Sequence, residues 1–238
     1  MPARHWPTAT VVRAPACFAV LLALAAGLGS SRARAEGVHP ELGLAMSGLV
    51  SLGEFATVSS FGFGGDGALH VVHIYRGLGV RAALGYQRLQ GHEMPTGEII
   101  YNGIGTQEGV FRATQYFFWT AIGPEWRAPV GSSQVDFYLM FGHADTDAGY
   151  SQPWLDTQGS VPGRNQVPLV VLGATWIPTS SRIELGMEAF SSGSAPFWAD
   201  PPVVVDGSGS HILQSKTASI TGIALRFGWR FWQPRSNS

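Results

Sequence analysis

Residues 223–232 read IALRFGWRFW, and large apolar side chains alternate there with small or cationic ones. In a β-strand, successive side chains point to opposite faces of the sheet. A helix would spread both classes around its circumference. The stretch therefore predicts a strand with one apolar wall and one face that accepts charge. The apolar face would carry Ile223, Leu225, Phe227, Trp229 and Phe231, and the other face Ala224, Arg226, Gly228, Arg230 and Trp232.

The same period-two alternation recurs in four earlier segments, at 42–52, 80–87, 135–142 and 183–189. Three more segments, near 68–76, 112–126 and 167–177, are strand-like in length and in β-branched and aromatic content, but the pattern leaves their facing open. Eight strands are predicted in all. They cover residues 40–52, 68–76, 79–90, 112–126, 134–144, 167–177, 182–192 and 215–232.

The connections between these strands alternate between long and short, at about 15, 2, 21, 7, 22, 4 and 22 residues. The long ones are rich in Gly, Ser, Pro, Asp and Asn, and the first contains FGFGGDG (61–67), which reads as a flexible outer loop. Several structureless loops of this length are uncommon in a compact soluble domain. Bacterial outer-membrane barrels combine short periplasmic turns with long outer loops. The chain is predicted to be all-β, an eight-stranded antiparallel up-and-down transmembrane β-barrel.

The N-terminus has the features of an export signal. Arg4, His5 and Arg13 precede an apolar run over 14–28, and Ala33-Arg34-Ala35 fits the small-x-small pattern of signal peptidase. About 15 apolar residues fall short of the roughly 20 that a membrane-spanning helix needs. We expect residues 1–35 to be a cleaved signal peptide, residues 36–238 to form the barrel domain, and Sec-type export to deliver it to the outer membrane of a Gram-negative bacterium.

Composition agrees with this prediction. Charged residues make up 13% of the 238 residues, hydrophobic residues 45%, and glycine 31 positions, which argues against a disordered chain and against a nucleic-acid binder with a basic face. Cleavage after Ala35 would leave 11 basic and 16 acidic side chains, a net charge of minus 5. It would also remove Cys17, the only cysteine, and with it any disulfide or cysteine metal ligand. Low charge suits strands with one face in lipid.

Aromatic residues gather at the ends of the strands that return toward the periplasm. A band of aromatic side chains is typical of both interfaces of a membrane barrel. The sequence predicts a periplasmic aromatic girdle formed by Trp126, Trp176, Trp229, Phe231 and Trp232.

The faces predicted to point inward carry charges of both signs. An eight-stranded barrel has an interior just wide enough for side chains to fill, and a buried charge without a partner costs several kcal/mol. Glu184 with Arg230 and Glu188 with Arg226 share a residue-number sum of 414, as directly opposed residues of an antiparallel pair would. We predict a lumen charge network of Arg81, Asp136, Glu184, Glu188, Arg226 and Arg230, the alternative being that these groups face water at strand ends. General diffusion of solutes is not expected, because porins use 16 to 18 strands.

The N-terminal segment, the eight alternating strands and the final TGIALRFGWRFW (221–232) resemble the small OmpA/OmpX-type outer-membrane β-barrels. The resemblance implies partners in outer-membrane lipid and in the barrel-assembly machinery, which recognises a terminal aromatic residue. Here 233–238 follow Trp232, a departure from that signal. From the filled lumen and the motifs together we expect a structural or surface-interaction role without catalysis, cofactor or metal. Apolar residues of the predicted loops would extend the strands, pack the loops together or bind a surface partner, namely Trp154, Leu155, Phe197, Trp198, Val203, Val204 and Val205.

Two alternatives stay open. One is a lipid-modifying enzyme at the outer rim, with Asp206, Ser208, Ser210 and His211 supplying the residue types of a hydrolytic or acyl-transfer site. The other is a soluble lipocalin-like barrel, whose interior would be apolar and whose exterior polar. A further cluster, His143, Asp145 and Asp147, could hold a divalent cation, although alternating aspartates in a turn are more often simple turn chemistry. The oligomeric state is not encoded in these patterns.

Overall fold

The computed structural model describes the backbone of residues 38–101, 105–152, 157–160, 166–178, 181–205 and 211–231. It describes the side chains of residues 38, 40–91, 115–147, 166–178, 181–197 and 217–231. The predicted signal peptide and Trp232 lie outside the described residues. In the described part of the chain, no helix has both the length and the apolar character needed to cross a membrane.

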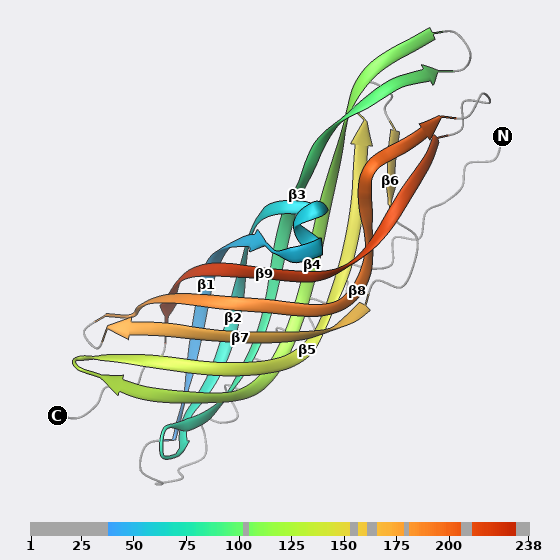
Figure 1. Ribbon diagram of the computed structural model, residues 1–238. Coiled ribbons are helices and arrows are strands. Elements are labelled where there is room, and N and C mark those ends of the chain that lie inside the picture. The colour runs from blue at the N-terminus through green and yellow to red at the C-terminus, as the bar shows by residue number, and fades with distance from the viewer. Residues whose placement is uncertain are drawn as a thin grey trace, which may run out of the picture.

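Eight long antiparallel strands form a closed barrel (Figure 1), which confirms the predicted fold class. Each strand pairs with its sequence neighbours, and β9 pairs with β1 to close the sheet. The short strand β6 (Thr157–Ser160) adds to the edge of β5, and a 3-10 helix η1 (Gly53–Thr57) joins β1 to β2. The barrel strands are β1 (His39–Ser51), β2 (Ser59–Tyr75), β3 (Leu78–Tyr101), β4 (Gly105–Val130), β5 (Ser133–Gln152), β7 (Gln166–Pro178), β8 (Ile183–Val205) and β9 (His211–Arg230).

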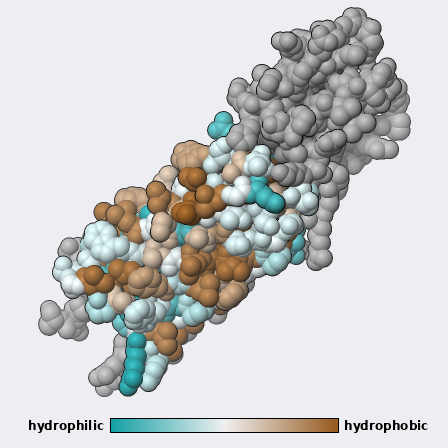
Figure 2. Space-filling model, in the orientation of Figure 1, coloured by the Kyte–Doolittle hydropathy of each residue, from teal (hydrophilic) through white to brown (hydrophobic). Residues whose placement is uncertain are grey.

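The barrel carries its apolar side chains on the outside. Ile223, Leu225 and Phe227 are 37%, 68% and 56% exposed, whereas Arg226 and Arg230, on the alternate positions of the same strand, are buried. Figure 2 shows apolar side chains gathered over the face formed by β7, β8 and β9. The outward apolar residues of β3 run over about nine residues, which at roughly 3.4 Å per residue and a 40° tilt make a band ~23 Å tall. This height matches the hydrocarbon-facing band of outer-membrane barrels.

The two ends of the barrel differ. At one end, here called the turn end, two-residue turns at Arg76–Gly77 and Gly131–Ser132 join adjacent strands. At the other, the extended end, β3 pairs with β4 as far as Tyr101, and β8 pairs with β9 as far as Val205. Figure 1 shows these two hairpins projecting from the barrel.

The extended strands correct the predicted long loops. β3 and β4 have 24 and 26 residues, more than twice the 9 to 11 that cross a bilayer. Strand pairing satisfies the backbone outside the membrane as well as inside it, but there both faces can be polar, so the alternation that signals a strand is lost. Of the predicted apolar loop residues, Phe197, Trp198 and 203–205 lie within β8, while Trp154 and Leu155 lie outside the described residues.

The glycine-rich FGFGGDG stretch is likewise part of a strand, β2, and not an outer loop. Glycine is needed where β2 approaches its neighbours closely. A Cβ at Gly64 would collide with the carbonyl oxygen of Tyr86 on β3. Asp66 at the end of the stretch points into the lumen and is buried.

The half of the lumen toward the extended end is packed with apolar side chains. Phe55 of η1 is fully buried and lies with its ring centroid 5.3 Å from that of Phe197. Phe190 makes edge contacts with Trp119 and Phe117 at centroid distances of 5.6 and 6.1 Å. The apolar plug, as we call this cluster, consists of Leu49, Phe55, Val58, Leu89, Phe117, Trp119, Val167, Leu169, Phe190, Phe197, Ala218 and Ile220.

Small residues make room for these rings. A Cβ at Gly85 would overlap the indole ring of Trp119, so this position accepts no side chain while the ring stays in place. Gly43 also faces the lumen, but the nearest atom to a Cβ there would be His70 Nε2 at 3.5 Å, an ordinary contact. Packing of the Trp119 ring therefore requires glycine at residue 85, whereas residue 43 has room for a methyl group.

We expect Gly85→Ala to destabilise the barrel by about 1–3 kcal/mol, because Trp119 has no space to yield in a filled lumen. Gly43→Ala serves as the matched control and should leave stability unchanged within ~0.5 kcal/mol. Urea unfolding in detergent micelles, followed by the change in gel mobility between folded and unfolded barrels, measures both. Equal stability of the two variants would show that the ring does not depend on Gly85.

Candidate functional site

Buried ionisable side chains fill the half of the lumen toward the turn end. They are six carboxylates, four guanidinium groups and one imidazole, and every barrel strand except β7 contributes at least one. The group, called the lumen network below, consists of Glu41, Asp66, His70, Arg81, Glu125, Arg127, Asp136, Glu184, Glu188, Arg226 and Arg230. Each strand supplies them from its inward-facing positions, because alternate residues share a face.

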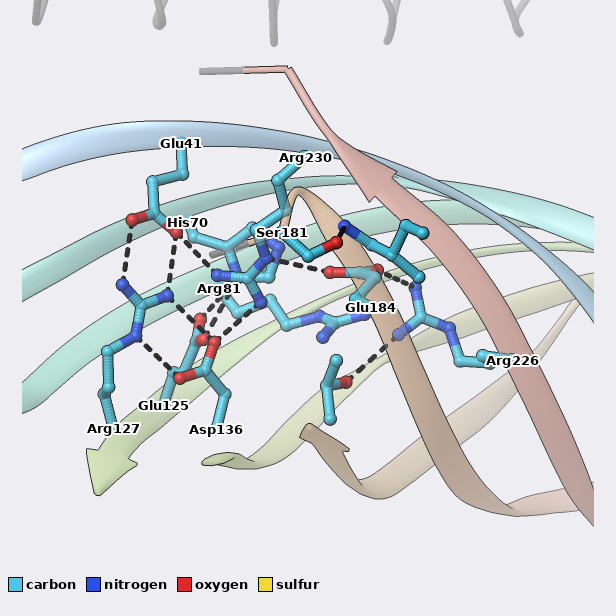
Figure 3. A network of polar contacts seen from close by, with 12 residues as sticks. Glu41, His70, Arg81, Glu125, Arg127, Asp136, Ser181, Glu184, Arg226 and Arg230 are labelled. Atoms are coloured by element: carbon cyan, nitrogen blue, oxygen red, sulfur yellow. Dashed lines mark hydrogen bonds and ion pairs between the residues drawn. The ribbon is translucent and has the colours of Figure 1, made fainter. Parts of the chain in front are cut away.

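The most tightly connected part of the lumen network is a ring of two arginines and two carboxylates (Figure 3). Arg127 donates two hydrogen bonds to Glu41, at 2.8 and 2.7 Å, and two to Asp136, at 2.7 and 2.9 Å. Arg230 donates to the same two carboxylates, at 2.5 Å to Glu41 and 2.6 Å to Asp136. Its Nε donates to Glu184 at 2.8 Å. Paired, forked contacts of this kind are the strongest hydrogen bonds that arginine makes.

A second group continues from the ring across the lumen. Arg226 binds Asp66 through two hydrogen bonds and lies 3.6 Å from Glu184 and 3.3 Å from Glu188. Arg81 reaches Glu188 at 3.3 Å, which joins β3 to β8 on the far side of the barrel. These contacts link the two groups into one network.

Tyr138 is the neutral centre of the second group. Its hydroxyl donates to Glu188 at 2.7 Å, and Arg81 lies over its ring with 3.8 Å between the guanidinium carbon and the ring centroid. A cation over an aromatic face is attracted by the ring quadrupole. Tyr138 therefore holds both partners of the Arg81–Glu188 pair.

His70 and Glu125 form a third, separate pair. The Nδ1 atom of His70 lies 2.7 and 3.1 Å from the two carboxylate oxygens of Glu125. Together with Asp136 they bring ligand-type atoms within 4.8 Å of one another, as a metal site would. However, Asp136 already accepts hydrogen bonds from Arg127 and Arg230, whose positive charges oppose a cation. We therefore assign these three residues to the lumen network.

All six residues predicted for the lumen point into it, and none faces the exterior. The two predicted ion pairs exist, Glu184 with Arg230 at 2.8 Å and Glu188 with Arg226 at 3.3 Å. The predicted register between β8 and β9 was wrong by two residues. Glu184 is opposite Gly228 and Glu188 is opposite Ala224, so each acid reaches the arginine two positions along β9. Long side chains bridge such diagonal neighbours readily.

Sequence reasoning missed five members of the lumen network. His70 and Glu125 belong to predicted strands whose facing was ambiguous, whereas Arg127 lay in the predicted connection after residue 126 and Asp66 in a predicted loop. Glu41 lies near the start of β1, ahead of the alternation that marks the strand. One signal could have placed Arg127 in the lumen. Arg127 and Asp136 are equally far in sequence from the two-residue turn at Gly131–Ser132, so they are directly opposed in the hairpin and share a face.

The predicted girdle residues lie at the turn end and face outward. Trp126, Trp176, Trp229 and Phe231 are about half exposed, and Trp126 stacks on Phe137 with 5.9 Å between ring centroids. Their role as a periplasmic girdle stays a prediction.

The other predicted clusters fare differently. His143, Asp145 and Asp147 lie in strand β5 and not in a turn, and all three side chains face outward. Among the described residues, the ligand atoms of these three side chains do not come together as a metal site would. This corrects the turn assignment and gives no support to a metal there. Asp206, Ser208 and Ser210 lie outside the described residues, as does the side chain of His211, so the rim site stays untested.

An apolar exterior, with the charged side chains of the same strands turned into the lumen, defines a barrel that spans a membrane. The soluble lipocalin-like alternative requires the reverse arrangement and is wrong for this chain.

No protein-family model and no curated protein matches the sequence. Among solved structures, the chain is similar to Ail, the attachment invasion locus protein of Yersinia pestis, in complex with the heparin analogue sucrose octasulfate, at 12% identity and a TM-score of 0.40, covering 81% of this chain and 96% of that one. It is also similar to the same protein in a phospholipid bilayer nanodisc, at 13% identity and a TM-score of 0.40, covering 81% and 100%. A major outer membrane protein from Thermus thermophilus is similar at 14% identity and a TM-score of 0.39, covering 81% and 99%.

Replacing Arg230 by Met should destabilise the barrel by about 3–5 kcal/mol, because Glu41, Asp136 and Glu184 would lose a buried cation. Arg182→Met removes an exposed cation near the turn end and should change stability by less than ~0.5 kcal/mol. Adding Asp136→Asn to Arg230→Met should restore part of the loss, since one unpaired charge is then removed. Denaturant midpoints in micelles report all three. If Arg230→Met unfolded at the same denaturant concentration as Arg182→Met, the ring would have no part in stability.

Proposed function

We propose that the protein is a barrel of the Gram-negative outer membrane that does not conduct solutes and acts through the structures at its extended end. The observation that carries this proposal is the filled lumen. The lumen network occupies the half toward the turn end, and the apolar plug occupies the other half. A general porin needs a wider barrel with an open channel.

The extended end is the part of the molecule offered to other molecules. Beyond the apolar band, β3–β4–β5 and β8–β9 continue as two separate sheets, while β1 ends at Ser51 and β7 begins only at Gln166. Outer-membrane barrels place short turns in the periplasm and long connections outside the cell. By this rule the two hairpins face the cell exterior, and the turn end with its aromatic residues faces the periplasm.

The proposal includes outer-membrane lipid as a partner around the apolar band, insertion by the barrel-assembly machinery through β9, and a surface partner at the two hairpins. It includes no catalytic step. The rival rim enzyme would require Ser208 or Ser210 near His211, so a Ser208→Ala and Ser210→Ala double variant that lost a lipid-modifying activity of the wild type would favour that rival.

The closed lumen predicts that the reconstituted protein adds no conductance to a planar bilayer and does not let small sugars swell liposomes, because side chains fill both halves. A general porin at the same protein-to-lipid ratio is the positive control. A variant combining Arg81→Ala with Phe197→Ala removes one large side chain from the lumen network and one from the apolar plug. It should therefore raise ion leakage through the lumen. Sugar permeation by the wild type at a rate close to that of the porin would overturn the proposal.

The orientation predicts which cysteines can be labelled on intact cells. Thr96→Cys lies in β3 beyond its last pair with β2, and Arg76→Cys lies in a two-residue turn at the opposite end. A membrane-impermeant maleimide should label residue 96 on intact cells, and residue 76 only after the outer membrane is permeabilised. Labelling in the reverse order would show that the hairpins face the periplasm.

A further inference from the structure

A groove of about 500 Å³ runs along the exterior of the barrel over β1, β2 and β3. Its floor is the backbone of β2 at Gly65, Asp66 and Gly67, where the two glycines leave the outward positions without side chains. The volume lies within the range of small-molecule sites. The walls are apolar and come from four strands, through Leu44, Met46, Leu84, Tyr86, Phe118, Phe227 and Trp229.

The groove lies at the level of the apolar band. Gly67 is paired with Leu44 on one side and Leu84 on the other, and Gly65 with Met46 and Tyr86. These four neighbours face outward among the apolar residues that would meet hydrocarbon. Whatever fills the groove therefore comes from the membrane side of the wall, in an environment where acyl chains replace water.

Packing does not require glycine at both floor positions. A Cβ at Gly65 would lie 2.7 Å from the carbonyl oxygen of Ala45, so no side chain fits there without moving the backbone. At Gly67 the nearest atom would be Leu44 Cδ2 at 3.3 Å, the end of a flexible side chain. Residue 67 could therefore carry a side chain at small cost, and a side chain there would fill the groove.

A cation stands at the end of the groove nearest the extended end. Arg88 is the next outward-facing residue of β3 after Tyr86, and it is exposed. It lies at the level of Phe63 on β2 and Tyr116 on β4, two residues beyond the last outward apolar residue of β3. The outward acids Asp145 and Asp147 lie on β5, on the far side of Tyr116 from the groove. A guanidinium at this depth is placed to bind a lipid phosphate.

We propose that this groove binds one acyl chain of a phosphate-bearing lipid of the outer leaflet, with the phosphate of that lipid at Arg88. The inference rests on the proposed membrane location. A groove one side chain deep and bounded by projecting rings accepts a single flexible chain. A second barrel, whose wall is convex, could not fill it, and a stable dimer would need more than ~1,000 Å² of matched surface.

The experiment uses the full barrel in nanodiscs of equal parts phosphatidylglycerol and phosphatidylcholine, released into the gas phase for native mass spectrometry. The wild type should retain one phosphatidylglycerol as its main adduct. Gly67→Leu should lower that adduct at least fivefold, because leucine occupies the floor. Ala189→Leu places the same leucine side chain at an exposed, outward position of β8 and should leave the adduct unchanged. Gel mobility before and after boiling confirms that each variant is folded.

Arg88→Gln separates the two halves of the proposed site. It should keep a lipid adduct but abolish the preference for phosphatidylglycerol over phosphatidylcholine. Both lipids carry a phosphodiester, but only phosphatidylglycerol has a net negative charge, which the guanidinium favours, whereas the choline ammonium of phosphatidylcholine opposes it. Two results would overturn the proposed lipid site while leaving the proposed membrane barrel intact. One is a folded, inserted wild type without a lipid adduct, and the other is an equal adduct in Gly67→Leu and Ala189→Leu. A wild type that fails to enter nanodiscs would overturn both. A dimer that Gly67→Leu converts to monomer would assign the groove to a second copy and overturn the lipid.

Discussion

Hydrocarbon offers no hydrogen-bond partners, so every backbone N–H and C=O that crosses a membrane must be paired within the protein. In this chain eight antiparallel strands satisfy that requirement by closing on themselves, with β9 against β1. Closure with eight strands fixes a narrow lumen, and the narrow lumen in turn decides what can stand inside it. Glycine under Trp119, the insertion of Phe55 from η1 and the dense charge pairing all follow from that limited width.

The interior charges give the barrel a definite register. A slip of one residue between two strands would move each inward group to the lipid face, where an arginine at midplane costs roughly 2–4 kcal/mol. In the ring, Arg127 and Arg230 each contact both Glu41 and Asp136, so four strands are positioned by one set of contacts. Replacing such a network by apolar residues can be neutral for stability in other proteins. In this barrel the lumen network excludes wrong strand registers as well as contributing to stability.

The fold could be predicted from alternation because lipid on one side and a small lumen on the other impose different residue types on successive positions. Arg81 and Arg226 could be placed inside on that basis alone. Asp66 could not, because the glycines that precede it erase the alternation, and His70 and Glu125 lie in strands that are apolar on both faces. The stagger between β8 and β9 was also beyond reach, since a residue-number sum of 412 or 414 leaves the same side chains on the same faces. Strand length outside the band has no hydrophobic signature at all.

The wiring of the lumen network constrains how the barrel is built. Glu41 stands on the first strand, yet the arginines that neutralise it come from β4 and β9. Asp66 on β2 likewise gains its hydrogen-bonded arginine, Arg226, only when β9 is in place. A barrel with its last strand missing would leave Glu184 without either of its arginines, and Glu41, Asp66, Asp136 and Glu188 with one cation fewer each. Such a deficit is tolerable only while water still reaches the carboxylates. Strands added one by one to a dry membrane would meet that cost at each step. The lumen must therefore stay wet until β9 docks against β1, and expulsion of water from the interior is the event that completes assembly.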